Sequence, residues 1–153
     1  LEFRRVLFRS RVSELNVARR SAPEMKQEAV WLLQYFQQQF GTPETHLETY
    51  EAFSPFTAET QNLHNLSHLD GLKLRFYTEP DTLWWKQMRD NQPEDLNAYG
   101  LKKLAEALQE TLPNAQIEYI ATENRGYRAN GDRHPHSWSI VDGEGLMEWM
   151  GLE

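Results

Sequence analysis

Two strand-like segments separated by one amphipathic helix are the feature that most constrains the fold of this chain. Residues 72–78 read Leu-Lys-Leu-Arg-Phe-Tyr-Thr and alternate between apolar and polar side chains, which is typical of a strand. Residues 116–121 form the second strand-like segment. Between them, apolar side chains recur at helical spacing over residues 96–112, namely Leu101, Leu104, Ala105, Leu108 and Leu112. This order predicts two parallel neighbours joined by a right-handed crossover, and therefore an α/β fold.

Helices are predicted on both sides of this unit. A capping-box pattern at Ser21 and Glu24, with Pro23 in the first turn, predicts a helix over residues 23–40, and Gly41 stands where a terminating glycine is expected. A second, shorter helix is predicted between Thr42-Pro43 and Ser54-Pro55. Residues 57–70 are polar and indicate a loop. A final helix is expected to carry the apolar residues Trp138, Val141, Leu146 and Trp149.

The chain is expected to be the C-terminal part of a single larger domain, because two strands alone do not make a stable sheet. Residues 1–10 read Leu-Glu-Phe-Arg-Arg-Val-Leu-Phe-Arg-Ser, which matches the translation of a sequencing adapter, and we expect them to be non-native. The domain portion is then residues 11–153. It divides into a helical segment, 11–56, and a strand-helix-strand-helix unit, 57–153.

Charge and composition exclude several classes of function. The net charge is −7, and it becomes −9 when the three Arg and one Glu of residues 1–10 are set aside. This balance argues against nucleic acid and anionic membrane surfaces as partners. The chain has no Cys, which excludes disulfides, thiolate metal sites and a Cys nucleophile within it. No apolar run approaches the ~18 residues that a transmembrane helix needs.

Polar residues that could carry chemistry follow both predicted strands. Asp81 lies in the turn Glu79-Pro80-Asp81 after the first strand, and His134 and His136 end the loop 122–136 after the second. Sites in open α/β sheets form at the carboxyl ends of the strands, so we expect these residues to converge. An acid that orients an imidazole, which in turn activates a nucleophile, is the arrangement of a Ser-His-Asp triad.

The same residues carry a resemblance to the α/β-hydrolase family. Ser54-Pro55, Tyr77-Thr78-Glu79-Pro80-Asp81 and His136-Ser137-Trp138 resemble the last two strand-helix units of esterase and peptidase-like members. Residues 124–142 also look like a segment of bacterial hydrolases. The resemblance covers roughly residues 42–150. It implies the last two strands of a three-layer α/β-hydrolase fold, with Asp81 as triad acid and His136 as triad histidine.

The resemblance further implies a serine hydrolase that cleaves a small ester or peptide-like substrate without a cofactor. In this family the nucleophile lies in a Gly-x-Ser-x-Gly turn that precedes the acid and the histidine. This sequence contains no such motif. We therefore expect the 153 residues by themselves to be inactive. A non-catalytic binding domain of hydrolase ancestry is the alternative that the missing motif leaves open.

Each candidate residue also has a simpler structural interpretation. Asp81 could cap the following segment, and His136 could begin a helix, with His134 as the competing triad base. Trp84 and Trp85 could line a substrate pocket or belong to the core. Arg133, with Arg125 and Arg128, could bind an anionic group of a substrate or form ordinary ion pairs.

A metal-dependent hydrolase is the alternative from another chemical class. His134 and His136, together with Asp81 or Asp132, offer the nitrogen and oxygen ligands that zinc accepts. Two histidines that are two residues apart in sequence can bind the same ion only if the backbone between them is strand-like. His64 and His68 are four residues apart, but they lie in a predicted loop.

Overall fold

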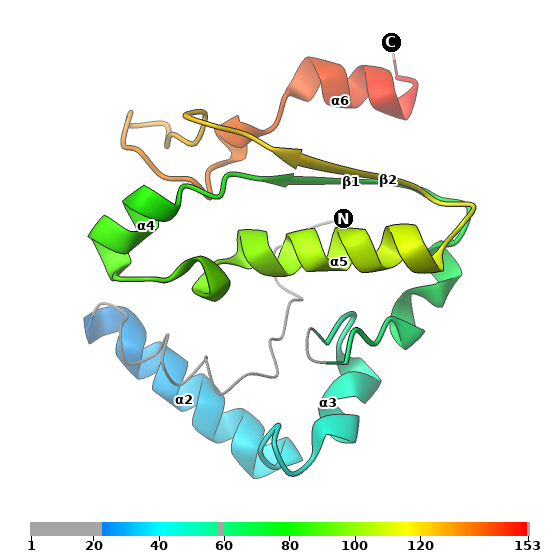
Figure 1. Ribbon diagram of the computed structural model, residues 1–153. Coiled ribbons are helices and arrows are strands. Elements are labelled where there is room, and N and C mark those ends of the chain that lie inside the picture. The colour runs from blue at the N-terminus through cyan, green and yellow to red at the C-terminus, as the bar shows by residue number, and fades with distance from the viewer. Residues whose placement is uncertain (1–22, 58–59, 153) are drawn as a thin grey trace.

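A computed structural model describes residues 23–57 and 60–152 of the chain, and these form helices around a small parallel sheet (Figure 1). Strand β1 (Lys73–Thr78) pairs with β2 (Gln116–Ala121) in parallel, in a register that runs from Lys73 opposite Gln116 to Thr78 opposite Ala121. Helix α5 (Asn97–Thr111) lies between the strands in sequence and makes the connection. The predicted parallel pair and the α/β class are confirmed. The expected non-native segment, residues 1–10, lies outside the described residues.

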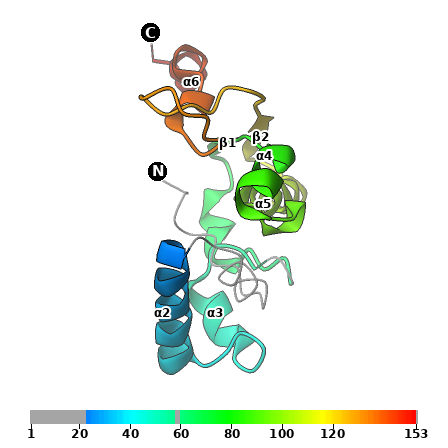
Figure 2. The ribbon, with the colours of Figure 1, turned by 90° about the vertical axis from the view of Figure 1, so that its left-hand side faces the viewer.

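The two faces of the sheet are covered in different ways, as Figure 2 shows with α6 on one side and α5 on the other. Phe76 of β1 and the α5 residues Leu104 and Leu108 are buried against each other on the α5 side. On the opposite side, Arg75 and Glu118 pair under helix α6 (Gly143–Met150). The α5 face is therefore the main apolar core, and the α6 face contains an ion pair.

The first two helices lie beyond α5, farther from the sheet (Figures 1 and 2). Helix α2 (Pro23–Phe40) has the predicted bounds, and Gly41 ends it with a positive φ of 76°. Helix α3 (Leu47–Phe53) starts later than predicted, because the amides of Thr45 and His46 both bond the Thr42 carbonyl in a preceding turn. Ser21, the predicted cap of α2, lies outside the described residues.

Three further segments differ from the sequence prediction. The predicted loop 57–70 contains a 3-10 helix, η2 (His64–Leu69). Leu63, Leu66 and Leu69 recur every third residue, which places them on one side of a helix with three residues per turn, and all three are buried in the core. Helix α4 (Thr82–Arg89) was not predicted. It is followed by a 3-10 turn, η3 (Pro93–Asp95).

The final predicted helix is divided into two elements. Residues Trp138–Ile140 form the short 3-10 helix η4, and α6 starts only at Gly143. Asp142 separates them, because its side chain accepts a hydrogen bond from the Gly145 amide at 3.1 Å and so caps α6. The prediction of one continuous helix is wrong for this reason. Within the described part of the chain, no helix combines the length and apolar character needed to cross a membrane.

Candidate functional site

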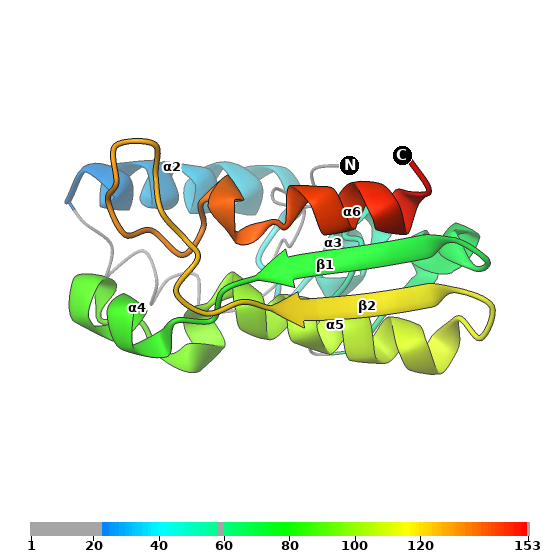
Figure 3. The same cartoon turned by 90° about the horizontal axis from the view of Figure 1, so that it is seen from above.

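The carboxyl ends of both strands meet at one edge of the sheet, where the polar segments gather. Figure 3 shows the two arrowheads side by side, pointing toward α4 and toward the loop that follows β2. The Thr122 amide extends the strand pairing by donating to the Thr78 carbonyl at 2.8 Å. The residues after β1 and the loop after β2 therefore converge, as the sequence predicts.

Glu79, the first residue after β1, is the most buried acid of this edge, with 2% of its surface exposed. One of its carboxylate oxygens accepts hydrogen bonds from the Thr122 hydroxyl at 3.0 Å, the Arg125 amide at 2.9 Å and the Gly126 amide at 3.0 Å. The other oxygen forms an ion pair with Arg133. A buried carboxylate needs such partners, so Glu79 fixes the start of the loop.

Arg133 connects the loop to both acids of the turn. Its guanidinium pairs with Glu79, and Nη2 also donates to Asp81 Oδ2 at 2.7 Å. Nη1 donates to the Gly126 carbonyl at 2.7 Å, so the guanidinium has three partners in total. Two carboxylates already neutralise this guanidinium. The arrangement favours the ion-pair interpretation of Arg133 over binding of an anionic substrate group.

Gly126 allows the loop to fold back closely on itself. A Cβ atom at this position would lie 2.7 Å from both the His134 carbonyl oxygen and the Pro135 Cα. The His134 amide donates to the Gly126 carbonyl at 2.7 Å, which holds the beginning and the end of the loop side by side. The histidine-bearing end of the loop is thus positioned against the segment that Glu79 anchors.

Asp81 serves as the N-cap of α4, which confirms the capping interpretation. Its Oδ1 accepts the Trp84 amide at 2.9 Å, and its Oδ2 accepts Arg133. The role of Asp81 as a triad acid stays a prediction.

The two histidines lie against the tryptophans of α4. The ring of His136 is 4.6 Å from that of Trp85, and the ring of His134 is 5.7 Å from that of Trp84. The two imidazoles are 6.1 Å apart. All four aromatic rings lie close together at the edge at which Asp81 lies.

The surroundings of His134 favour its neutral form. Burial is the largest influence that lowers its pKa below the ordinary value, and the positive charges of Arg128 and Arg89 lower it further. A hydrogen bond with the backbone acts in the opposite direction without reversing the shift. A neutral imidazole can accept or donate a proton through either nitrogen, depending on its tautomer.

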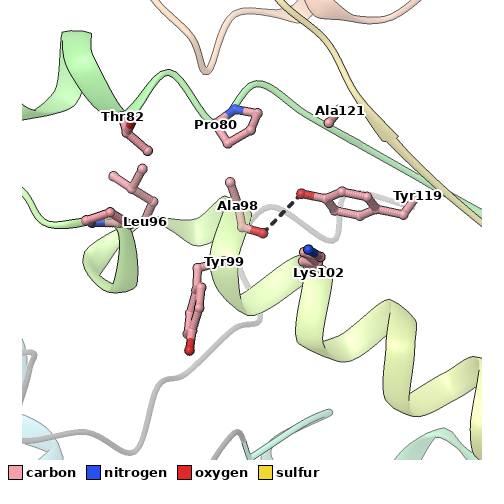
Figure 4. A pocket seen from close by; sticks show the side chains of 9 residues that line it. Pro80, Thr82, Leu96, Ala98, Tyr99, Lys102, Tyr119 and Ala121 are labelled. Carbon is pink, nitrogen blue, oxygen red and sulfur yellow. Dashed lines mark hydrogen bonds between the residues drawn. The ribbon is translucent and has the colours of Figure 1, made fainter.

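Trp84 and Trp85 differ in exposure. Trp85 is 8% exposed and packs with Leu96 and Ala98, which supports the core interpretation for this residue. Trp84 is half-buried against the same cluster, with its ring 4.7 Å from that of Trp85. Neither of them lines the cavity of about 380 Å³ found beside this edge (Figure 4). The cavity is likewise not lined by Asp81, Arg133 or the two histidines.

A metal site would require several possible ligands to lie close together. Among residues 23–57 and 60–152, no three His, Cys, Asp or Glu side chains come together in a group that could hold a metal ion. His64 and His68 belong to the 3-10 helix η2, where residues four apart do not share a face as they do on an α-helix. No cluster of ligands therefore supports a metal site in the described part of the chain.

Comparison of the chain with protein-family models, with curated proteins and with solved structures found no match. The structure itself defines a chain of the α/β class, with a polar site at the carboxyl edge of two parallel strands. Glu79 is the residue of this site that the sequence prediction missed. The signal in the sequence was its position directly after the alternating residues 72–78, in the turn Glu79-Pro80-Asp81.

Proposed function

We propose that this chain supplies the acid and the histidine of a Ser-His-Asp triad to a serine hydrolase of the three-layer α/β-hydrolase fold. The substrate class is a small ester or a peptide-like amide. One observation carries the proposal: the acid-bearing turn after β1 and the histidine-bearing loop after β2 are bound to each other at one sheet edge. Active sites of open α/β folds form at this edge.

His136 is the general base of the proposed reaction. It would take the proton of a serine hydroxyl as that oxygen attacks the substrate carbonyl, and then pass the proton to the leaving group. Its ring rests against buried Trp85, which limits the orientations of the imidazole. Water would later hydrolyse the acyl intermediate with the same group acting as base.

Asp81 is the orienting acid of the proposed triad. An ionised carboxylate can accept about four hydrogen bonds, so the contacts with Trp84 and Arg133 leave capacity for one imidazole N–H. The proposal requires a ring nitrogen of His136 to come within about 2.6–3.2 Å of an Asp81 oxygen in the active enzyme. The proposal gives the role of the base to His136 and leaves His134, beside Trp84, without a part in the triad.

The proposal requires a serine nucleophile from outside the given residues, since the 153 residues contain no Gly-x-Ser-x-Gly motif. The source DNA upstream of the codon for Arg11 is therefore the first test. A reading frame that encodes this motif between a strand and a helix supports the proposal. A complete reading frame with no serine at a strand-to-helix turn contradicts it and favours the non-catalytic binding domain.

Kinetics of the full-length protein with p-nitrophenyl butyrate test the residue roles. We expect His136→Ala to lower kcat by at least about 10³-fold, as removal of a triad base does in serine hydrolases. His134→Ala is the matched control, because it removes the neighbouring imidazole from the same loop and should retain most activity. Equal rates for His136→Ala and the wild type would overturn the assignment.

A further inference from the structure

A second potential site is the cavity of about 380 Å³ on the α5 side of the sheet edge (Figure 4). It lies between the turn after β1, the start of α5 and the end of β2. Its lining also includes the first residue of α4, Thr82, and Pro93 of η3. The volume falls within the ~300–1,000 Å³ typical of small-molecule sites.

Rings make up much of the lining. Pro80, Pro93 and Tyr119 contribute three of them. The Tyr119 hydroxyl donates to the Ala98 carbonyl at 3.3 Å across the cavity, which fixes the direction of its ring (Figure 4). Aromatic rings favour offset-stacked or edge-to-face contact with another ring, so this lining suits a flat aromatic group.

The charge of the lining is one-sided. Lys102 is its one basic residue, and none of the nine lining residues is acidic. Lys102 does have a partner, Glu106, one helical turn away, but the Nζ–Oε1 distance is 3.9 Å and both side chains are more than half exposed. Exposed pairs of this kind are weak, so a ligand carboxylate can compete for the ammonium group.

We propose that this cavity binds a small aromatic carboxylate, with the ring among the proline and tyrosine side chains and the carboxylate toward Lys102. The proposal concerns binding alone and does not depend on the triad. Hydrolase activity without ligand binding in this cavity, and ligand binding without hydrolase activity, are therefore separate outcomes.

Phenylacetate and its neutral analogue phenylacetamide are the probes for this proposal. We expect phenylacetate to bind this chain with a Kd of about 1 mM, as suits a ligand of this size, and to shift the amide NMR signals of Ala98 and Ala121. Lys102→Gln should weaken phenylacetate binding about 3–5-fold and leave phenylacetamide binding unchanged. Lys86→Gln is the matched control, because Lys86 also forms an exposed pair four residues along a helix but does not line the cavity.

Filling the cavity provides an independent check. Ala121 is exposed at the end of β2, so Ala121→Phe should fold normally and abolish binding of both probes. Circular dichroism shows whether each variant is folded. If Ala121→Phe does not fold, the Lys102→Gln result decides the proposal. Shifts outside the lining residues, binding that survives Ala121→Phe in a folded protein, or equal effects of Lys102→Gln and Lys86→Gln would overturn the proposal.

Discussion

The α5 face of the sheet and its carboxyl edge are held together by different physical forces. On the α5 face, buried apolar side chains such as Phe76, Leu104 and Leu108 are packed together. At the edge, one buried carboxylate and one guanidinium collect backbone amides and carbonyls from the turn and the loop. Hydrophobic packing depends little on pH or direction, whereas hydrogen bonds and ion pairs depend on both. The core should therefore determine whether the chain folds, and the edge should determine how the site is shaped.

The largest expected effect comes from a cavity in the core. Leu108 is 0% exposed, and Leu108→Ala should lower the free energy of unfolding by about 2–5 kcal/mol. The loss should be global, so urea unfolding followed by circular dichroism and by tryptophan fluorescence should shift together. A shift confined to one probe would show that the core is not a single cooperative unit.

Replacing Glu79 should have a smaller and more local effect. Glu79→Gln keeps the shape but replaces an acceptor with an amide donor facing Arg133, and we expect a loss of about 1–3 kcal/mol. Amide exchange measured by NMR should accelerate at Arg125 and Gly126, whose N–H groups bond this carboxylate. The exposed Glu110→Gln is the matched control. Unchanged protection at both amides would contradict the anchoring role of Glu79.

The strands, the main helices and the meeting of the two polar segments could be predicted from the sequence. Residues 116–121 and 23–40 have the predicted bounds because their patterns are long or strongly bounded. Helix α4 was missed because its eight residues give only two turns of periodicity. The burial of Glu79 shows a deeper limit of sequence reasoning. Glu79 is buried because Arg125 and Gly126, which are 46 and 47 residues away in the sequence, fold back onto its carboxylate. The sequence near Glu79 does not encode this contact.

The α6 face also depends on charged groups, because Arg75 and Glu118 form an ion pair there. Glu118 accepts Arg75 Nε and Trp149 Nε1, each at 2.8 Å. Burial acts to raise the pKa of Glu118, but hydrogen bonds from Arg75, Trp149 and Gln116 outweigh it and lower the pKa. The stabilisation is therefore complete above the ordinary pKa of 4.5 and is lost as pH falls through the lowered value.

The indole N–H signal of Trp149 in NMR spectra measures this attachment. We expect it to move toward its unfolded position as the pH falls below 4.5, while signals from the α5 core stay in place. In Glu118→Gln the signal should lose this pH dependence. A pH response that persists in the variant would assign the titration to another group.

The smallest effect is expected at His134, whose pKa is lowered by burial and by neighbouring arginines. Its ring should titrate in NMR with a midpoint below the ordinary 6.5. The unfolded chain then takes up this proton first, so stability falls as pH drops through 6.5 toward the folded value. His134→Gln should remove this part of the decrease. A midpoint at or above 6.5 would contradict the described surroundings of the ring.

The bridge that Arg133 makes between Glu79 and Asp81 has an evolutionary consequence. Arg133 forms an ion pair with each of the two carboxylates. Replacing Arg133 alone would therefore leave two neighbouring carboxylates, one of them buried, without a cation. Replacing Glu79 alone would change the balance in the opposite direction. In related sequences, positions 79 and 133 should therefore change as a pair, whereas the exposed loop residues around Asn130 should vary independently.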